Sequence, residues 1–254
     1  MMNEEIRFKK EDKIAWIKMN RPSKLNALTS AMLDSFQQAI LKANLDDDIR
    51  VIAIVGSERA FCAGADIEEE QTMDASDALA FSIRGQNLCQ ALQLSMKPVV
   101  AVIDGYALGG GLEMALACDF RISSKDGLFG FPEVTLGVTT GWGGATNLVK
   151  MIGPSKAKEL LMLGKIISAE EAYQLGIISE LVPADQLIAA ASELAEKLSS
   201  LPASSLAMVK NLVNKYSESF SPKEQFLEAV ANAYCYSLEE KAKAYEAFMG
   251  RKKK

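Results

Sequence analysis

The sequence predicts an α/β fold followed by a helical C-terminal region. Short β-branched apolar runs of strand length alternate with longer segments in which apolar residues recur at helical spacing. The order strand, strand, helix repeats loosely before Ala184, and only helical patterns follow it, with breaks at two prolines. We therefore expect an α/β core over residues 1–195 and a helical region over residues 196–254.

The first predicted elements are a hairpin, a helix and a buried strand. Residues 6–9 and 14–19 flank a charged turn and predict the β-hairpin. Apolar residues at helical spacing from Ala31 onward indicate the helix. The continuous β-branched run at 51–55 is typical of a buried strand.

The middle of the chain adds two more helices and several short strands. Residues 74–94 are expected to form a helix with four side chains facing inward, namely Leu79, Ile83, Leu88 and Leu92. Another helix is expected to open at residues 141–144 and to end near Gly153. Short apolar runs predict strands at 99–103, 120–123, 128–131 and 177–182.

Composition indicates a globular protein and argues against several functions. Hydrophobic residues make up 49% of the chain and charged residues 24%, with a net charge of −5. The acidic balance argues against a broad nucleic-acid surface. The polar N-terminus has no apolar segment typical of a signal peptide, and no apolar run approaches membrane-spanning length. We expect a cytoplasmic protein that does not bind membranes.

The chain contains no histidine, which restricts the chemistry available to it. Ser-His-Asp and Cys-His catalysis are excluded, as are histidine-based metal sites. Acid–base catalysis would fall to Glu, Asp, Lys, Tyr or water. The four cysteines have no CxxC spacing, so we expect reduced, mostly buried thiols and no metal site.

The segment most suggestive of function is a glycine-rich turn at residues 105–113, which reads Gly-Tyr-Ala-Leu-Gly-Gly-Gly-Leu-Glu. It joins the predicted strand at 99–103 to a helical pattern, and such a turn exposes backbone N–H groups at a helix N-terminus. The spacing matches neither of the common phosphate-binding glycine motifs. Stabilisation of an oxyanion is the functional interpretation that remains, and an ordinary turn is the alternative, because glycine clusters are usually just turns.

Two glutamates accompany this turn. Glu113 is expected in the first turn of the helix, and Glu133 follows twenty residues later in a Phe-Pro-Glu sequence. Each has an ordinary alternative role, Glu113 as a partner of the helix dipole and Glu133 as a solvated loop charge. Together, two carboxylates beside an oxyanion-stabilising turn suit acid–base chemistry next to a carbonyl group.

Four motifs resemble those of the enoyl-CoA hydratase (crotonase) superfamily, in that family's order and spacing. They are Arg-Pro-x-x-Leu-Asn-Ala-Leu at 21–28, Phe-Cys-Ala-Gly-Ala-Asp at 61–66, the glycine turn at 105–113, and Phe-Pro-Glu-x-x-Leu-Gly at 131–137. The resemblance covers essentially the whole chain. It is specific for the superfamily and less specific for the reaction, because superfamily members catalyse several.

The resemblance implies a crotonase-like spiral of ββα units and a helical C-terminal region that builds trimers, usually paired into hexamers. It also implies an acyl-CoA thioester as substrate and no further cofactor. The backbone N–H groups of Ala65 and Gly110 would form the oxyanion hole, and Glu113 and Glu133 would be the catalytic glutamates. The CoA groove would be formed by Lys24, Leu25, Ala27, Ala63, Asp66 and Ile67, largely through backbone atoms.

Two departures from the family pattern concern the predicted substrate groove. Glu68 stands where many hydratases have a lysine near the mouth of the CoA pocket. Trp142 is bulky in a segment that borders the acyl pocket in relatives, so it either shortens that pocket or packs at a helix start. A shortened pocket would favour short acyl chains.

The resemblance favours hydration of a trans-2-enoyl-CoA to a 3-hydroxyacyl-CoA, by syn addition of water. Glu113 would activate the attacking water, and Glu133 would deliver a proton to C2. A Δ3-Δ2 enoyl-CoA isomerase is the nearest alternative, although it needs only one glutamate. A thioester hydrolase, an RNA-binding protein of the same fold and a purely structural trimer are further alternatives. A basic, aromatic strip for RNA is missing from the sequence.

Overall fold

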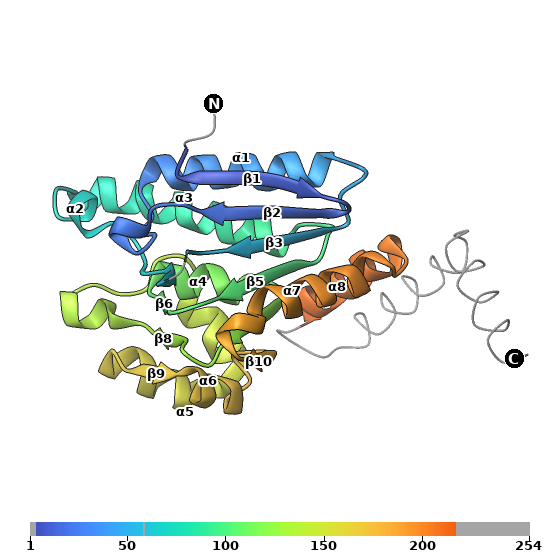
Figure 1. The fold of residues 1–254 in the computed structure, drawn as a ribbon. Coiled ribbons are helices and arrows are strands. Elements are labelled where there is room, and N and C mark those ends of the chain that lie inside the picture. The colour runs from blue at the N-terminus through green and yellow to red at the C-terminus, as the bar shows by residue number, and fades with distance from the viewer. Residues whose placement is uncertain (1–3, 58, 217–254) are drawn as a thin grey trace, which may run out of the picture.

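The computed structural model describes residues 4–57 and 59–216, which form two β-sheets enclosed by helices (Figure 1). The larger sheet has six strands, in the spatial order β1 (Ile6–Glu11), β2 (Ile14–Met19), β3 (Val51–Val55), β5 (Val99–Ile103), β7 (Phe120–Ser124) and β10 (Glu180–Val182). Only the β1–β2 pair is antiparallel, as expected for the predicted hairpin. The other neighbouring strands of this sheet run parallel.

The smaller sheet contains four short strands, in the order β4 (Ala60–Cys62), β6 (Tyr106–Leu108), β8 (Leu128–Gly130) and β9 (Ile166–Ser168). The first three run parallel to one another, and β9 pairs antiparallel with β8. Each of the pairs β3–β4, β5–β6 and β7–β8 gives its first strand to the larger sheet and its second to the smaller one. Helices follow each pair, so the predicted spiral of ββα units is confirmed.

The helices are distributed along the whole described chain. They are α1 (Ser30–Leu45), α2 (Ile67–Glu70), α3 (Ala75–Gln93), α4 (Gly110–Leu116), α5 (Gly144–Leu163), α6 (Ala169–Gln174), α7 (Leu187–Ser199) and α8 (Ala203–Tyr216). Short 3-10 helices lie at Pro22–Lys24 (η1), Pro132–Leu136 (η2) and Ala184–Gln186 (η3). The helix α5 is kinked at Gly153, where a helix end was predicted.

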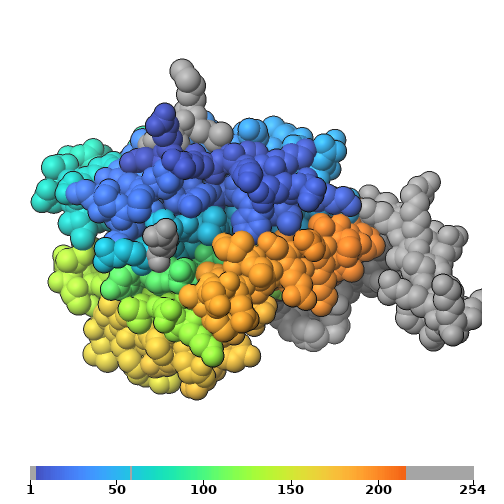
Figure 2. Space-filling model, in the orientation of Figure 1, coloured from blue at the N-terminus to red at the C-terminus, as the bar shows by residue number. Residues whose placement is uncertain are grey.

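The central strands β3 and β5 of the larger sheet are buried on both faces, which explains their continuous apolar sequences. On β3, Ile52 and Ile54 pack in the main core with α1 and α3, whereas Val51 and Ala53 pack against α7 on the other face. Figure 2 shows α7 and α8 as an orange band across the sheet. The predicted boundary at residue 195 falls within α7, and the division into two regions stays a prediction.

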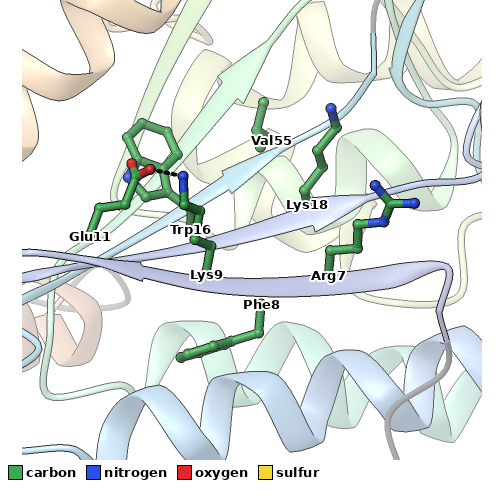
Figure 3. Close-up of a pocket in the computed structure, with 7 residues that line it drawn as sticks. All are labelled: Arg7, Phe8, Lys9, Glu11, Trp16, Lys18 and Val55. Atoms are coloured by element: carbon green, nitrogen blue, oxygen red, sulfur yellow. Dashed lines mark ion pairs between the residues drawn. The ribbon is translucent and has the colours of Figure 1, made fainter.

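The part of the sheet that α7 does not cover carries a shallow depression on β1 and β2 (Figure 3). Trp16 and Val55 contribute its apolar surface, and Arg7, Lys9 and Lys18 surround them. This depression contains none of the predicted site residues. Within residues 4–57 and 59–216, no helix combines the length and apolar character needed to cross a membrane.

One prediction about α3 is partly wrong. Leu88 and Leu92 are buried, but Leu79 and Ile83 have exposed fractions of 63% and 46%. Phe81 and Gly85 lie on the inward face instead. This face of α3 lies inward because Gly85 provides the space in which the ring of Trp142 packs.

Candidate active site

The glycine turn joins β6 to α4, as its sequence predicted. Gly109 caps the helix with φ of 49°, a backbone conformation that favours glycine, and its N–H donates to the carbonyl of Gly130 at 2.9 Å. Gly110 begins the helix, so its N–H has no acceptor within the helix. Among the hydrogen bonds of the described chain, the N–H of Gly110 has no acceptor either.

The second predicted oxyanion donor, Ala65, lies beside the first. An ideal Cβ on Gly64 would stand 3.5 Å from the nitrogen of Gly110, so the two backbone segments are in contact. Ala65 forms a parallel bridge with Leu28, which uses the carbonyl of Gly64 and the N–H of Asp66. The N–H of Ala65 takes no part in that bridge. The segments that carry the two predicted donors therefore lie against each other, and neither N–H donates to a backbone acceptor in the described part of the chain.

Glu113 lies in the first turn of α4, as predicted, and its side chain is buried behind the turn, with an exposed fraction of 2%. Its Oε1 accepts hydrogen bonds from the backbone nitrogens of Trp142 at 2.8 Å and Gly144 at 2.7 Å. Burial raises the pKa of this carboxyl group above its usual value, and the backbone N–H groups oppose that increase. The contacts fix the orientation of the carboxylate and favour its ionised form.

Glu133 reaches the same turn from η2. An ideal Cβ on Gly109 would lie 3.1 Å from its Oε1, so the carboxyl group rests directly against the turn. Both of its oxygens are buried without a hydrogen-bond partner in the described structure. Burial is the main cause that raises its pKa to about 7, and the carboxylates of Glu113 and Glu70 act in the same direction. The alternative of a solvated loop charge is thus wrong for Glu133.

Trp142 packs behind the glycine turn and is almost fully buried, with an exposed fraction of 5%. A Cβ on either Gly85 or Gly110 would overlap its indole ring, so the ring fills the space between these two glycines. It also packs against the ring of Phe81, with the centroids 5.7 Å apart. Trp142 therefore packs its ring against Gly110, a predicted oxyanion donor, and donates its backbone N–H to Glu113.

The predicted CoA groove is bordered by two segments that hydrogen bonds hold together. The N–H of Ala63 donates to the carbonyl of Leu25 at 3.0 Å, and the N–H of Ala27 donates to the carbonyl of Lys24 at 3.0 Å. Leu25 adopts the left-handed conformation, with φ of 50°, at the end of η1. The lysine side chain extends outward and forms an ion pair with Glu68.

Asp66 and Ile67 have different environments, although both were predicted to line the groove. The carboxylate of Asp66 is buried, forms an ion pair with Arg21 and accepts from the N–H groups of Glu68 and Glu69. It acts as the N-cap of α2. Ile67 is exposed at the start of that helix. The backbone of Asp66 is also engaged, because its N–H donates to the carbonyl of Leu28 and its carbonyl accepts from the N–H groups of Glu69 and Glu70.

Two supporting residues had no predicted role. The buried side chain of Asn26 donates to the carbonyls of Ala60 at 2.8 Å and Phe61 at 3.1 Å, which ties the loop at 21–28 to β4. Gly109 leaves room for the carboxyl group of Glu133. Both belong to the motifs quoted above, but their roles depend on contacts between distant segments. The described residues contain no group of three or more acidic or cysteine side chains that could hold a metal ion.

Comparisons with known proteins agree with this fold. Residues 9–254 match the family model described as enoyl-CoA hydratase/isomerase. The crotonyl-CoA hydratase of Syntrophomonas wolfei is 34% identical over the whole chain and 98% of its own length. The short-chain-enoyl-CoA hydratase of Clostridium acetobutylicum is 35% identical over 97% of this chain and 95% of its own.

A solved structure gives the same result. The enoyl-CoA hydratase of Bacillus anthracis superposes with a TM-score of 0.94 and 30% identity, covering 98% of this chain and 97% of that one. The fold places the protein in the crotonase class. The chain belongs to the enoyl-CoA hydratase/isomerase family.

Proposed function

We propose that this protein is an enoyl-CoA hydratase, which adds water across a trans-2-enoyl-CoA to give a 3-hydroxyacyl-CoA. One observation carries the proposal: two buried carboxyl groups, those of Glu113 and Glu133, meet at a turn with two available N–H donors. The hydratase relatives, similar over nearly their whole length, support it. The chemistry requires no cofactor, because the CoA thioester is itself the substrate.

The N–H groups of Ala65 and Gly110 would stabilise the charge that develops on the thioester oxygen. Attack of water at C3 pushes electrons onto that oxygen and forms an enolate. Preorganised backbone donors stabilise it without reorganisation during the reaction, and loss of one such donor costs about 3–4 kcal/mol in other enzymes. The rigid packing of Trp142 beneath Gly110 supports this preorganisation.

The environments of the two glutamates suit different roles. Glu113, held by two backbone N–H groups, is suited to accept a proton from the attacking water. Glu133, with a pKa of about 7 and no hydrogen-bond partner, can carry a proton at neutral pH. It is suited to donate that proton to C2 of the enolate, after which proton exchange with water restores the starting state.

The proposal is tested with crotonyl-CoA, whose conjugated absorbance disappears on hydration. We expect Glu113→Gln and Glu133→Gln each to lower kcat by about 10²–10⁴-fold, the usual contribution of an acid–base group. The amide introduced by Glu113→Gln keeps an oxygen for the N–H groups of Trp142 and Gly144. Affinity for butyryl-CoA, a saturated analogue measured by calorimetry, should stay within about twofold of the unmodified enzyme's.

Glu196→Gln is the matched control, because Glu196 is an exposed residue of α7. Near-normal turnover by either active-site variant would remove that glutamate from the mechanism. Movement of the double bond without formation of the 3-hydroxyacyl product would instead support the isomerase alternative. An isomerase needs only one proton-shuttling carboxylate, so the presence of two favours hydration.

We also propose that Trp142 limits the length of the acyl chain. Its ring contacts the oxyanion donor Gly110 and occupies space beside the place where a thioester would bind. Short four-carbon substrates should therefore be preferred, and Trp142→Ala should raise kcat/KM for decenoyl-CoA relative to crotonyl-CoA. Activity of the unmodified enzyme that rises steadily from four to ten carbons would contradict this role.

The groove and the assembly complete the proposed function. The backbones of Lys24, Leu25, Ala27, Ala63, Asp66 and Ile67 would contact CoA. We further propose a homotrimer or a hexamer of paired trimers. Large apolar side chains exposed on α8 and near the end of α3 support self-association, namely Leu94, Met96, Val209 and Val213. Light scattering of the purified full chain tests this, and a monomer would contradict it.

A further inference from the structure

The two segments that border the predicted groove are bridged at their outer ends by a pair of opposite charges. Deeper in the groove, backbone hydrogen bonds join them, from Ala63 to Leu25 and from Leu28 to Gly64. At the rim, Lys24 ends η1 and Glu68 lies in the first turn of α2. The Nζ of Lys24 forms an ion pair with the Oε1 of Glu68 across the gap.

This ion pair can exchange partners. The side chains of Lys24 and Glu68 have exposed fractions of 42% and 68%. An exposed pair contributes little to stability and is screened by salt, so a stronger anion can replace the carboxylate. A phosphate group is such an anion, because it presents several strong acceptor oxygens.

The rest of the rim is acidic, and most of its charges have other partners. Asp66 is paired with Arg21, and Glu69 accepts hydrogen bonds from the N–H and hydroxyl of Ser30. Glu68 is the acid of α2 that faces Lys24. The thioester must reach Ala65 and Gly110, so the phosphate groups of CoA would remain near the outer rim. There the rim charges act on them through a screening length of about 8 Å at physiological salt.

We propose that Glu68 determines the affinity for the nucleotide end of CoA by competing with its phosphate groups for Lys24. Binding then exchanges one partner of Lys24 for another and brings like charges together at Glu68. The nucleotide contributes less to binding than it would beside an unpaired lysine. This inference rests on the proposed function, since it requires a CoA thioester in the groove.

The test compares crotonyl-CoA with crotonyl-pantetheine, which has the same thioester but no phosphate groups. At low ionic strength, we expect Glu68→Gln to lower KM for crotonyl-CoA about threefold and Glu68→Lys about tenfold. With crotonyl-pantetheine, the change in KM should stay below about twofold, because no phosphate is present to respond. At about 0.5 M salt, the differences with crotonyl-CoA should also fall below twofold, since charges are then screened over a few ångströms.

Glu180→Gln is the matched control, with the same change in net charge at an exposed residue of β10, far from α2 in Figure 1. It should not lower KM for crotonyl-CoA. Three results would overturn the inference: unchanged KM in both Glu68 variants, an equal decrease with crotonyl-pantetheine, or an equal decrease in the control. Unchanged KM would mean that Glu68 does not compete with phosphate for Lys24. An equal decrease with crotonyl-pantetheine would place the effect at the thioester, and an equal decrease in the control would make it an effect of net charge.

Calorimetric binding of free CoA separates this inference from the proposed function. CoA binding that tightens in the Glu68 variants, without any hydration of crotonyl-CoA, would overturn the hydratase proposal and retain the role of Glu68. Hydration with no response of either KM or the CoA dissociation constant would overturn the role of Glu68 alone. Absence of binding by both CoA and its thioesters would overturn both.

Discussion

The carboxyl group of Glu133 is buried against Gly109 with no hydrogen-bond partner in the described structure, and its pKa is raised to about 7. At that value the group is present in both protonation states near neutral pH. A general acid must begin the reaction protonated, so its activity is lost as pH rises through its pKa. This environment gives two predictions about pH.

The first concerns catalysis. In the pH profile of kcat/KM with crotonyl-CoA, we expect an alkaline limb with an apparent pKa of about 7. Glu70→Gln should move that limb to lower pH, because the carboxylate of Glu70 raises the pKa of Glu133. A profile that is flat to about pH 9, or a limb that Glu70→Gln does not move, would contradict the assignment.

The second concerns stability. The folded protein binds the proton of Glu133 more tightly than the unfolded chain, whose carboxyl group has a pKa near 4.5. The stability gained from this proton is therefore present below pH 4.5 and lost as pH rises through about 7. At pH 8, the free energy of unfolding of the Glu133→Gln variant should be about 1–3 kcal/mol higher than that of the unmodified protein. Urea unfolding at pH 8 and pH 5 measures this, and a gain that is equal at both would contradict it.

Sequence identified these glutamates only as candidates. Glu113 followed from its place after three glycines, because the first turn of a helix can be recognised locally. The burial of Glu133 could not be predicted in this way, since it depends on β6 and η2 meeting at Gly109. The ion pair of Asp66 could not be predicted from the sequence either, because Arg21 is distant from Asp66 in the chain.

At the scale of elements, the packing of α3 against the segment before α5 depends on one glycine. Any side chain at position 85 would overlap the ring of Trp142. The helical spacing of α3 was predicted correctly, but only Leu88 and Leu92 of the four predicted inward side chains are buried. Apolar residues lie on more than one side of this helix, and Gly85 carries no hydrophobic signal to identify the buried side.

Gly85→Ala is expected to lower stability, although alanine favours helix formation. Overpacking of the ring should cost about 1–3 kcal/mol, which outweighs the gain of up to about 1 kcal/mol in helix propensity. In a Trp142→Leu background the same substitution should cost much less, because the ring is absent. Urea unfolding of the single and double variants measures this coupling, and strictly additive costs would contradict the proposed contact.

At the scale of the whole molecule, an ion pair joins α8 to the sheet. Lys210 donates to the carboxylate of Asp119 at 2.8 Å and to the carbonyl of Leu92 at 2.9 Å. Asp119 also accepts from the N–H of Val99 at 2.7 Å. Both side chains are largely buried, with exposed fractions of 7% and 17%. This contact connects the helical region to the start of the central strand β5.

Lys210→Met should destabilise the fold by about 3–5 kcal/mol, because it leaves a buried carboxylate without its cation. Adding Asp119→Asn should recover part of that loss, since the amide oxygen can still accept from Val99. Chemical unfolding of both variants tests this. A double variant no more stable than Lys210→Met would contradict the ion pair as the cause.

The overall architecture was the most predictable feature, because each ββα unit has its own local signals and the motifs occur in a fixed order. The distribution of strands between two sheets required three-dimensional information. The final predicted helices, residue Cys235 and the basic end of the chain lie outside the described residues. The trimer or hexamer remains a proposal.

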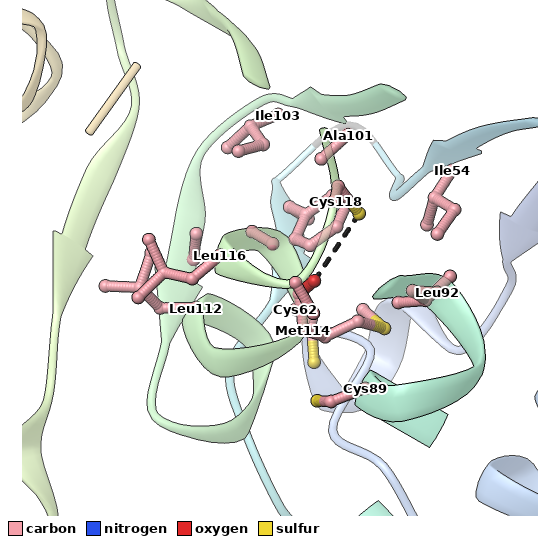
Figure 4. Close-up of a cluster of buried hydrophobic side chains, with 14 of the residues drawn as sticks. Ile54, Cys62, Cys89, Leu92, Ala101, Ile103, Leu112, Met114, Leu116 and Cys118 are labelled. Carbon is pink, nitrogen blue, oxygen red and sulfur yellow. Dashed lines mark hydrogen bonds between the residues drawn. The ribbon is translucent and has the colours of Figure 1, made fainter. Parts of the chain in front are cut away.

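The three cysteines in Figure 4 have a consequence for the durability of the enzyme. An enoyl thioester is an electrophile that thiolates attack, so an accessible ionised cysteine would become alkylated by the substrate. Cys62, Cys89 and Cys118 are all buried among apolar side chains. Burial raises the pKa of Cys62 and Cys118 to about 12, and raises that of Cys89 well above its usual value. These three described thiols therefore stay protonated near neutral pH, which disfavours their attack on a reactive enoyl thioester.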